Sequence, residues 1–269
     1  MSTRAEGARA GSSDGAPLPP SDDDAPLPTT PDDDARIAGL PAALAAVRAR
    51  VDRAAAAAGR DPAGVRVLLA TKTMSPAVVA AAVRAGAILL GENRVQELVA
   101  KGPALAEVAT LHLIGPLQSN KVNAALVWAA CVQSVDTLEL AGRMSRRCAT
   151  TDRDLEVMVQ VNVSGEPTKH GVVPADAVAL AVAVAALPRL RLTGLMTIGA
   201  RSDDVAHVRS GYAVLRELRD AVIASGRPGT AEARELSMGM SGDLEAAVAE
   251  GATMLRIGSA VFGARATTA

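Results

Sequence analysis

The chain has 269 residues, enough for one large α/β domain or two small ones. Hydrophobic residues make up 49% of it and charged residues 21%, but aromatic residues only 1%, which disfavours single-stranded nucleic-acid recognition because that depends on aromatic stacking. The net charge is -1 and the basic residues form no stripe, so we expect no nucleic-acid partner.

Cysteine and histidine usage gives no sign of a disulfide framework or a metal site. Cys131 and Cys148 are too few and lack metal-site spacing, and His112, His170 and His207 share no spacing that makes a metal site or a triad. No apolar run reaches the length of a membrane span, and the N-terminus lacks a signal-peptide pattern. We therefore expect no metal and no membrane partner, and we expect a monomer in the reducing cytoplasm.

Residues 1–35 differ in composition from the rest of the chain. They are rich in Pro, Asp, Gly and Ser, and they carry two basic and eight acidic side chains. Such a segment cannot bury enough apolar surface to offset the entropy of ordering, so we predict a disordered acidic tail followed by one folded domain over residues 36–269.

From residue 36 onward, helical and strand patterns alternate. Apolar, β-branched runs predict eight strands at 65–71, 87–91, 110–115, 131–135, 155–163, 190–198, 234–238 and 253–257. Helical periodicity predicts helices at 36–58, 76–85, 94–101, 119–129, 137–149, 174–187, 203–225 and 242–250. This alternation indicates a parallel sheet, and eight strands favour a closed (β/α)8 barrel. A doubly wound open sheet is the alternative, but the glycine-rich loop expected after its first strand is absent.

Lys72 lies at the carboxyl end of the first predicted strand, before a helix that Ser75 caps and Pro76 begins. Four of the 28 basic residues are lysines, so the chain uses arginine for nearly all its positive charge. A lysine amine can lose its proton and attack a carbonyl to form a Schiff base, which a guanidinium cannot do. The alternative is a lysine whose stem covers apolar surface while its ammonium group reaches water.

Barrel enzymes place their chemistry at the carboxyl ends of the strands, and phosphate sites there often use the loops after strands seven and eight. Those loops contain Ser241 and the pair Gly258-Ser259, and Ser241 is also a candidate N-cap of helix 242–250. Asn93 fits a capping box with Gln96. Arg256, on the last strand, needs a partner because a buried cation is costly: either a salt bridge or a ring nitrogen.

Seven segments occur in the order typical of one protein family. They are LLATKT (68–73), GENRVQE (91–97), HLIGPLQSNK (112–121), PTKHGV (167–172), GLMTI (194–198), LSMGMSGDLEAA (236–247) and MLRIGSAVFGAR (254–265). Together they closely resemble the pyridoxal phosphate homeostasis protein family, which looks like the barrel domain of alanine racemase standing alone. The resemblance covers about residues 36–265. It departs from the family at Met74 and Arg94, where a second lysine and a tyrosine are often found.

The resemblance implies a role for each candidate residue. Lys72 would carry pyridoxal 5'-phosphate as a Schiff base, Ser241 with Gly258 and Ser259 would hold the phosphate, and Arg256 would face the pyridine nitrogen. Asn93 and Ser237 match further positions that line the cofactor site.

The resemblance also implies a carrier that buffers the cofactor or supplies it to apoenzymes, with no catalytic residues. An amino-acid racemase is the alternative, but racemisation needs a second base besides the lysine. In alanine racemase that base is a tyrosine of a C-terminal domain, whereas this chain ends four residues past the last family segment. Its one tyrosine, Tyr212, falls on a helix expected outside the barrel. An unrelated sugar-phosphate enzyme on the same fold is a third hypothesis.

Overall fold

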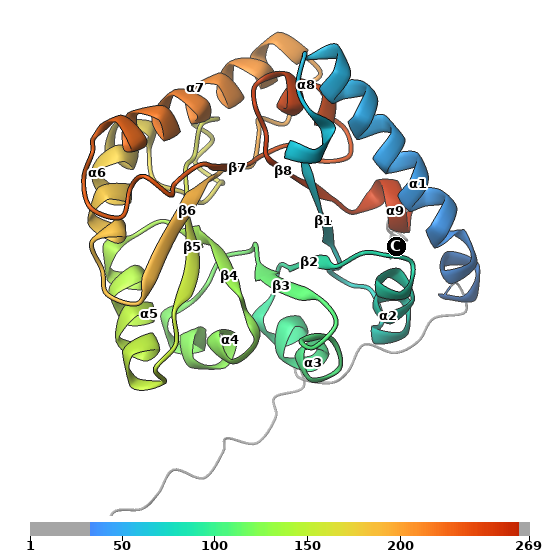
Figure 1. Ribbon diagram of the computed structural model, residues 1–269, viewed down its shortest axis with the longest axis horizontal. Coiled ribbons are helices and arrows are strands. Elements are labelled where there is room, and N and C mark those ends of the chain that lie inside the picture. Colours follow the sequence, from blue (N-terminus) through green and yellow to red (C-terminus); the bar gives the residue numbers. More distant parts are fainter. Residues whose placement is uncertain (1–32, 264–269) are drawn as a thin grey trace, which may run out of the picture.

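Eight apolar segments form parallel strands that close into a barrel in the order of the sequence (Figure 1). The computed structural model describes residues 33–263. The strands are β1 (Arg66–Ala70), β2 (Leu89–Glu92), β3 (Thr110–Leu113), β4 (Cys131–Val135), β5 (Leu155–Gln160), β6 (Leu190–Met196), β7 (Glu235–Ser237) and β8 (Met254–Ile257). The pairing of β1 with β8 closes the ring, which confirms the predicted barrel and excludes the open sheet.

Helices follow the strands and surround the barrel (Figure 1). They are α1 (Asp33–Ala57), α2 (Pro76–Arg84), α3 (Val95–Leu105), α4 (Val122–Trp128), α5 (Leu138–Thr150), α6 (Pro174–Ala185), α7 (Val205–Ala224), α8 (Leu244–Ala249) and α9 (Ser259–Phe262), with short 3₁₀ turns η2 (Pro62–Gly64) and η3 (Ser119–Lys121). The sequence did not predict α9, which is a single turn after β8. The cap of α2 is confirmed, because the Ser75 hydroxyl accepts from the Val78 amide.

Within the described residues, α1 begins at Asp33, three residues before the predicted start of the domain. The side chain of Asp33 is buried and accepts a hydrogen bond of 2.6 Å from the Ser75 hydroxyl, so this end of α1 is tied to the start of α2. Most of the predicted tail, residues 1–32, lies outside the described residues. Its last three residues belong to the helix instead.

Side chains pack in two layers, one on each face of the sheet. The larger layer lies between the strands and the surrounding helices. The smaller one fills the barrel interior with six buried apolar side chains: Leu68, Ile114, Cys131, Met158, Met196 and Met254. Because alternate residues of a strand face opposite sides of the sheet, the same strands contribute to both layers, as Leu68 and Leu69 of β1 do.

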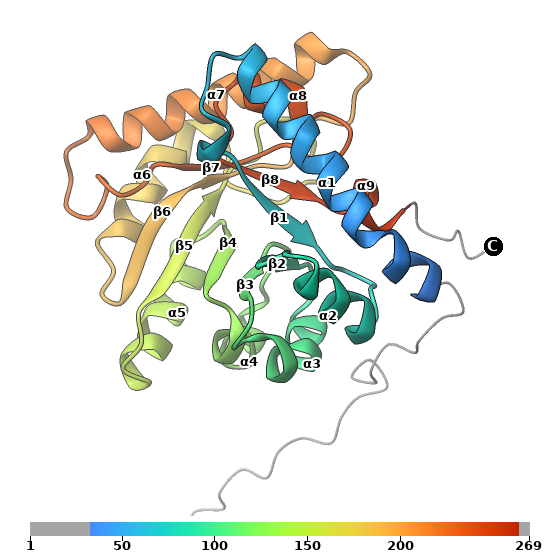
Figure 2. The ribbon, with the colours of Figure 1, turned by 45° about the vertical axis from the view of Figure 1, so that its right-hand side comes forward.

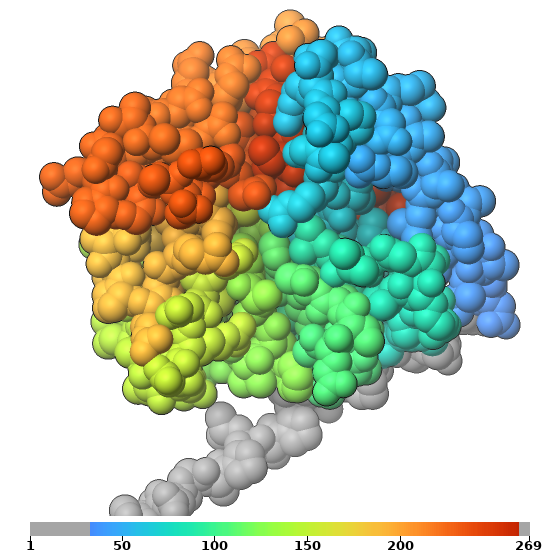
Figure 3. Space-filling model, in the orientation of Figure 1, coloured from blue at the N-terminus to red at the C-terminus, as the bar shows by residue number. Residues whose placement is uncertain are grey.

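Helix α1 joins the beginning of the described chain to its end. It packs against α2, α8 and α9, and both ribbon views show it lying along the outside of the barrel beside α8 (Figure 2). In the space-filling view, the blue N-terminal helix lies directly against the red and orange C-terminal segments (Figure 3). No helix in residues 33–263 combines the length and apolar character needed to cross a membrane.

Candidate functional site

A cavity of about 340 Å³ opens at the carboxyl ends of β1, β7 and β8. Five of the seven residues predicted for the site line it: Lys72, Ser241, Arg256, Gly258 and Ser259. They come from three segments that are far apart in sequence and that the barrel closure brings together. The remaining wall is largely small or apolar, with Met74, Met240 and Phe262 among its residues.

Lys72 is half-buried and lies in a tight turn between β1 and α2. The next residue, Thr73, has a φ of 64°, a left-handed conformation that is unfavourable for a β-branched residue. The Met74 amide donates to the Thr71 carbonyl at 3.1 Å, and the Thr73 hydroxyl donates to the Lys72 carbonyl at 2.6 Å. The backbone that carries the lysine is therefore sharply bent and restrained on both sides.

Three buried charged side chains lie directly behind this turn. Lys101 of α3 donates from Nζ to Oε1 of Glu92 at 2.8 Å and to Oε2 of Glu97 at 3.3 Å. The Thr71 hydroxyl donates to the same Glu92 oxygen at 2.5 Å. Burial raises the pKa of Glu92 to about 7, although Lys101 and the Thr71 hydroxyl act in the opposite direction. The predicted helix 94–101 placed Lys101 correctly on α3, but its sequence gave no sign of this network.

Arg256 extends into the barrel from β8 and is 5% exposed. Its Nη1 donates to the Ser237 hydroxyl at 2.9 Å and its Nη2 to the Thr197 carbonyl at 2.6 Å, and it forms no ion pair among residues 33–263. Burial lowers the pKa of this guanidinium, but an arginine stays protonated at neutral pH. A buried cation held only by neutral oxygens, with a cavity beside it, favours a ligand that accepts hydrogen bonds.

A chain of hydrogen bonds continues from Arg256 into the barrel. The Ser237 hydroxyl donates to Oε1 of Gln133 at 2.7 Å, and Nε2 of Gln133 lies 2.8 Å from Nδ1 of His112. Because the Gln133 oxygen faces Ser237, its amide nitrogen faces the histidine, and the pattern assigns Nδ1 as acceptor. Burial lowers the pKa of His112 to about 3, so the ring is neutral.

The loops after β7 and β8 meet at the other side of the cavity. The Ser241 hydroxyl accepts from the Ala260 amide at 3.2 Å, which links the two loops. Arg50 of α1 donates from Nη1 to the Ser241 carbonyl at 2.7 Å and also pairs with Glu245. The α1 helix therefore fixes the position of the first loop. Sequence reasoning missed Arg50 because it lies 191 residues from its partner.

Two predicted site residues, Asn93 and Ser237, do not line this cavity. Ser237 is fully buried and holds Arg256 from behind. Asn93 packs with its backbone against Gly115, where an added Cβ would lie 2.1 Å from the Asn93 carbonyl oxygen. The predicted capping box is wrong, since Arg94 is the N-cap of α3 and its side chain makes no capping hydrogen bond.

The predicted N-cap role of Ser241 is also wrong. Helix α8 begins at Leu244 with Asp243 as its N-cap, because the residues from Ser241 to Asp243 form a turn. Asp243 accepts hydrogen bonds from the Met240 amide at 2.6 Å and from the Tyr212 hydroxyl at 2.7 Å. Ser241 is thereby left to face the loop after β8.

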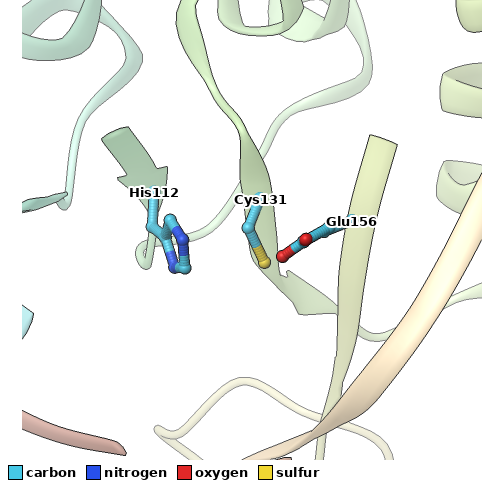
Figure 4. Close-up of side chains that lie close together, drawn as sticks. All are labelled: His112, Cys131 and Glu156. Atoms are coloured by element: carbon cyan, nitrogen blue, oxygen red, sulfur yellow. The ribbon is translucent and has the colours of Figure 1, made fainter. Parts of the chain in front are cut away.

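Three side chains with metal-ligating atoms lie close together on β3, β4 and β5, and none of them lines the cavity (Figure 4). The ligand atoms of His112, Cys131 and Glu156 lie within 4.8 Å of one another, and strand register explains why, since His112 pairs with Cys131 and Cys131 with Glu156. The residue spacing gave no hint of this group. Burial raises the pKa of the Cys131 thiol, and Arg191 already pairs with Glu156, so a metal ion would have to displace both a proton and an arginine.

Comparisons with known proteins agree with this fold. Residues 43–266 match the family model described as alanine racemase, N-terminal domain. The pyridoxal phosphate homeostasis protein of Pseudomonas aeruginosa is 46% identical over 82% of this chain and 94% of its own length, and that of Escherichia coli K12 is 40% identical over 82% and 95%. The solved structure of PipY from Synechococcus elongatus with PLP bound is 32% identical, with a TM-score of 0.69 over 79% of this chain and 99% of that one.

Proposed function

This chain belongs to the alanine racemase N-terminal domain family and, within it, to the pyridoxal phosphate homeostasis proteins. On this premise we propose that it binds pyridoxal 5'-phosphate in the cavity beside Lys72, holds it as a Schiff base on that lysine, and buffers or supplies it to apoenzymes in the cytoplasm. The observation that carries the proposal is the meeting of one lysine, two serine-containing loops and one buried arginine, which forms no ion pair among residues 33–263, in a single cavity.

The residues of the cavity fit this cofactor. When bound, the cofactor supplies an aldehyde that forms a C=N bond with a neutral amine and releases the carbonyl oxygen as water. Lys72 provides the amine, and its position at the end of β1 directs it toward the cavity. The described wall contains no carboxylate that would repel a phosphate dianion.

The phosphate is held, in this proposal, by the loops after β7 and β8. The Ser241 hydroxyl uses a lone pair to accept from the Ala260 amide, so its proton remains for a phosphate oxygen. Ser259 adds a second hydroxyl, and Gly258 lets the backbone approach closely because it has no side chain. Arg50 keeps the first loop in place from outside.

Arg256 is assigned to the pyridine nitrogen of the cofactor. Two of its donors are already used by Ser237 and Thr197, which fixes the plane of the guanidinium beside the cavity. Because the guanidinium keeps its protons, it donates a hydrogen bond to the ring nitrogen without protonating it. The ring is then a weaker electron sink than a protonated pyridinium.

The composition of the cavity wall favours a carrier over a racemase. Among the described residues that line it, Lys72 and Arg256 are the ones with titratable side chains, so no second base faces the lysine. Tyr212 is buried, its hydroxyl donates to Asp243, and burial raises its pKa well above the usual value, so it stays protonated at neutral pH and is not available as a base. Racemisation requires a second base on the opposite face of the substrate.

The proposal is tested by adding pyridoxal 5'-phosphate to the purified protein, removing the unbound cofactor by gel filtration, and recording the near-visible absorbance of the protein before and after borohydride. We expect a band that borohydride bleaches, present in the wild type and in the Lys121→Ala control but absent in Lys72→Ala. A band that persists in Lys72→Ala would contradict the assignment. Sustained loss of optical rotation from L-alanine by the loaded protein would favour the racemase.

A further inference from the structure

Two side chains of α3 hold the backbone on both sides of Lys72. Nζ of Lys101 donates to the carbonyl of Thr71 at 2.8 Å, and Oε2 of Glu97 accepts from the amide of Thr73 at 2.8 Å. The Thr71 carbonyl belongs to the peptide group before Lys72, and the Thr73 amide belongs to the peptide group after it. Fixing both peptide planes fixes the φ and ψ angles of Lys72, and with them the direction of its Cα–Cβ bond.

The turn needs such restraint because it is strained. A threonine at a φ of 64° is disfavoured by contacts of its branched Cβ with the backbone, so this conformation persists only when its surroundings enforce it. The hydrogen bond from the Thr73 amide to Glu97 is the contact that specifies this conformation from outside the turn. Lys101 joins the other side of the turn to the same carboxylate.

Glu97 and Lys101, which together form a clamp on the backbone of Lys72, are well suited to act as one rigid unit. Glu97 and Lys101 lie one helical turn apart on α3, at 8% and 2% exposed, and Glu92 at the end of β2 completes the group. Because buried charges are costly when unpaired, neither residue can swing away from the other without a large penalty. Oε2 of Glu92 has no hydrogen-bond partner among the described residues, so Thr71 and Lys101 both hold this side chain through Oε1.

We propose that Glu97 and Lys101 are positioning residues that aim the Lys72 amine at the cofactor aldehyde. This inference rests on the proposed function, since it assumes that Lys72 forms the Schiff base. Neither residue lines the cavity, so they act on the lysine through its backbone and not through the ligand. The clamp should therefore govern how fast the bond to Lys72 forms and leave the affinity for the rest of the cofactor almost unchanged.

The test compares Glu97→Ala, Glu97→Gln and a control, Glu250→Ala. Glu250 is a matched control because it is also 8% exposed and holds two cations, Arg209 and Arg216, while it lies away from the cavity wall. Three quantities are measured: the rate constant of Schiff-base formation with pyridoxal 5'-phosphate, the affinity for pyridoxine 5'-phosphate, which lacks the aldehyde, and the melting temperature.

We expect Glu97→Ala to slow Schiff-base formation by about tenfold or more, because misplacement of a reacting group by about 1 Å costs up to about a hundredfold. Affinity for pyridoxine 5'-phosphate should change by less than about threefold, since no phosphate or ring contact is lost. Glu97→Gln should fold and give an intermediate rate, because its amide oxygen still accepts from Thr73. Glu250→Ala should lower the melting temperature but leave the rate at the wild-type value.

The clamp is refuted if Glu97→Ala reacts at the wild-type rate, or if Glu250→Ala slows the reaction as much as Glu97→Ala does. Should Glu97→Ala fail to fold, Glu97→Met takes its place, because it keeps the side-chain volume and removes the acceptor, and a wild-type rate in that variant refutes the clamp. If the wild-type protein forms no Schiff base on Lys72, the proposed function itself is refuted. If the wild type reacts and the Glu97 variants react at the same rate, only the clamp is refuted.

Discussion

Replacing Ser237 by alanine should destabilise the protein more than the loss of one hydroxyl suggests. The side chain is fully buried, accepts from Arg256 at 2.9 Å and donates to Gln133 at 2.7 Å. The substitution therefore leaves a buried guanidinium N–H and a buried amide oxygen without partners. A hydrogen bond to a charged group contributes about 1.5–3 kcal/mol and an unsatisfied buried acceptor costs about 1–3 kcal/mol, so we expect a loss of about 3 kcal/mol.

Urea unfolding provides the measurement. With an m-value of about 3 kcal/mol/M, the midpoint of Ser237→Ala should fall by about 1 M while the m-value stays constant. Ser210→Ala is the control, because that hydroxyl is exposed and bonds only within its own helix, to the His207 carbonyl. Its free energy of unfolding should change by less than about 0.5 kcal/mol. Equal stability of Ser237→Ala and Ser210→Ala would show that Ser237 does not hold Arg256.

Three further changes test other contacts. Burial raises the pKa of Glu92 to about 7 in the folded protein, so its contribution to stability is present below about pH 4.5 and is lost as the pH rises to 7. Over this range the free energy of unfolding of the wild type should therefore fall by about 2 kcal/mol more than that of Glu92→Gln. Parallel pH profiles of the two proteins would contradict this. Arg50→Ala should weaken pyridoxal 5'-phosphate binding by about three- to tenfold through the freed Ser241 loop, whereas Arg53→Ala, an exposed change on the same helix, should not. Gly239→Ala should lower the free energy of unfolding by about 2–4 kcal/mol, because the φ of Gly239 is 88° and a Cβ there would lie 2.4 Å from the Cβ of Ala247. Gly226 also has a positive φ but faces open space, so Gly226→Ala should lower it by only about 1 kcal/mol. Equal losses would show that packing around Gly239 is loose.

The sequence predicted the barrel because its strands and helices alternate with clear periodicity. Every predicted strand overlaps one in the structure. The rule that barrel chemistry lies at the carboxyl ends of strands selected five residues that line one cavity: Lys72, Ser241, Arg256, Gly258 and Ser259. Strand ends were placed less well, as for β5, which ends at Gln160 and not at 163. Beyond Gln160 the backbone pairs with the loop that follows, since the Asn162 amide donates to the Val172 carbonyl, and no local sequence pattern predicts this pairing.

Contacts between distant segments could not be predicted in the same way. The role of Ser237 behind Arg256 depends on how β7 and β8 are placed side by side, and the group of His112, Cys131 and Glu156 depends on the register of three strands. The clamp on Lys72 is another example. In the sequence, Glu97 has the pattern of an ordinary carboxylate on a helix. Its hydrogen bond with the Thr73 amide depends on where α3 lies relative to the turn after β1, which the sequence pattern does not predict.

The central claim is that Lys72 is the amine that binds pyridoxal 5'-phosphate, and peptide mass spectrometry tests it most directly. The purified protein is incubated with the cofactor, reduced with borohydride and digested. The account predicts a pyridoxyl phosphate mass on the peptide that contains Lys72, with Lys101, Lys121 and Lys169 unmodified. An unmodified Lys72, or a dominant adduct on another lysine, would contradict it.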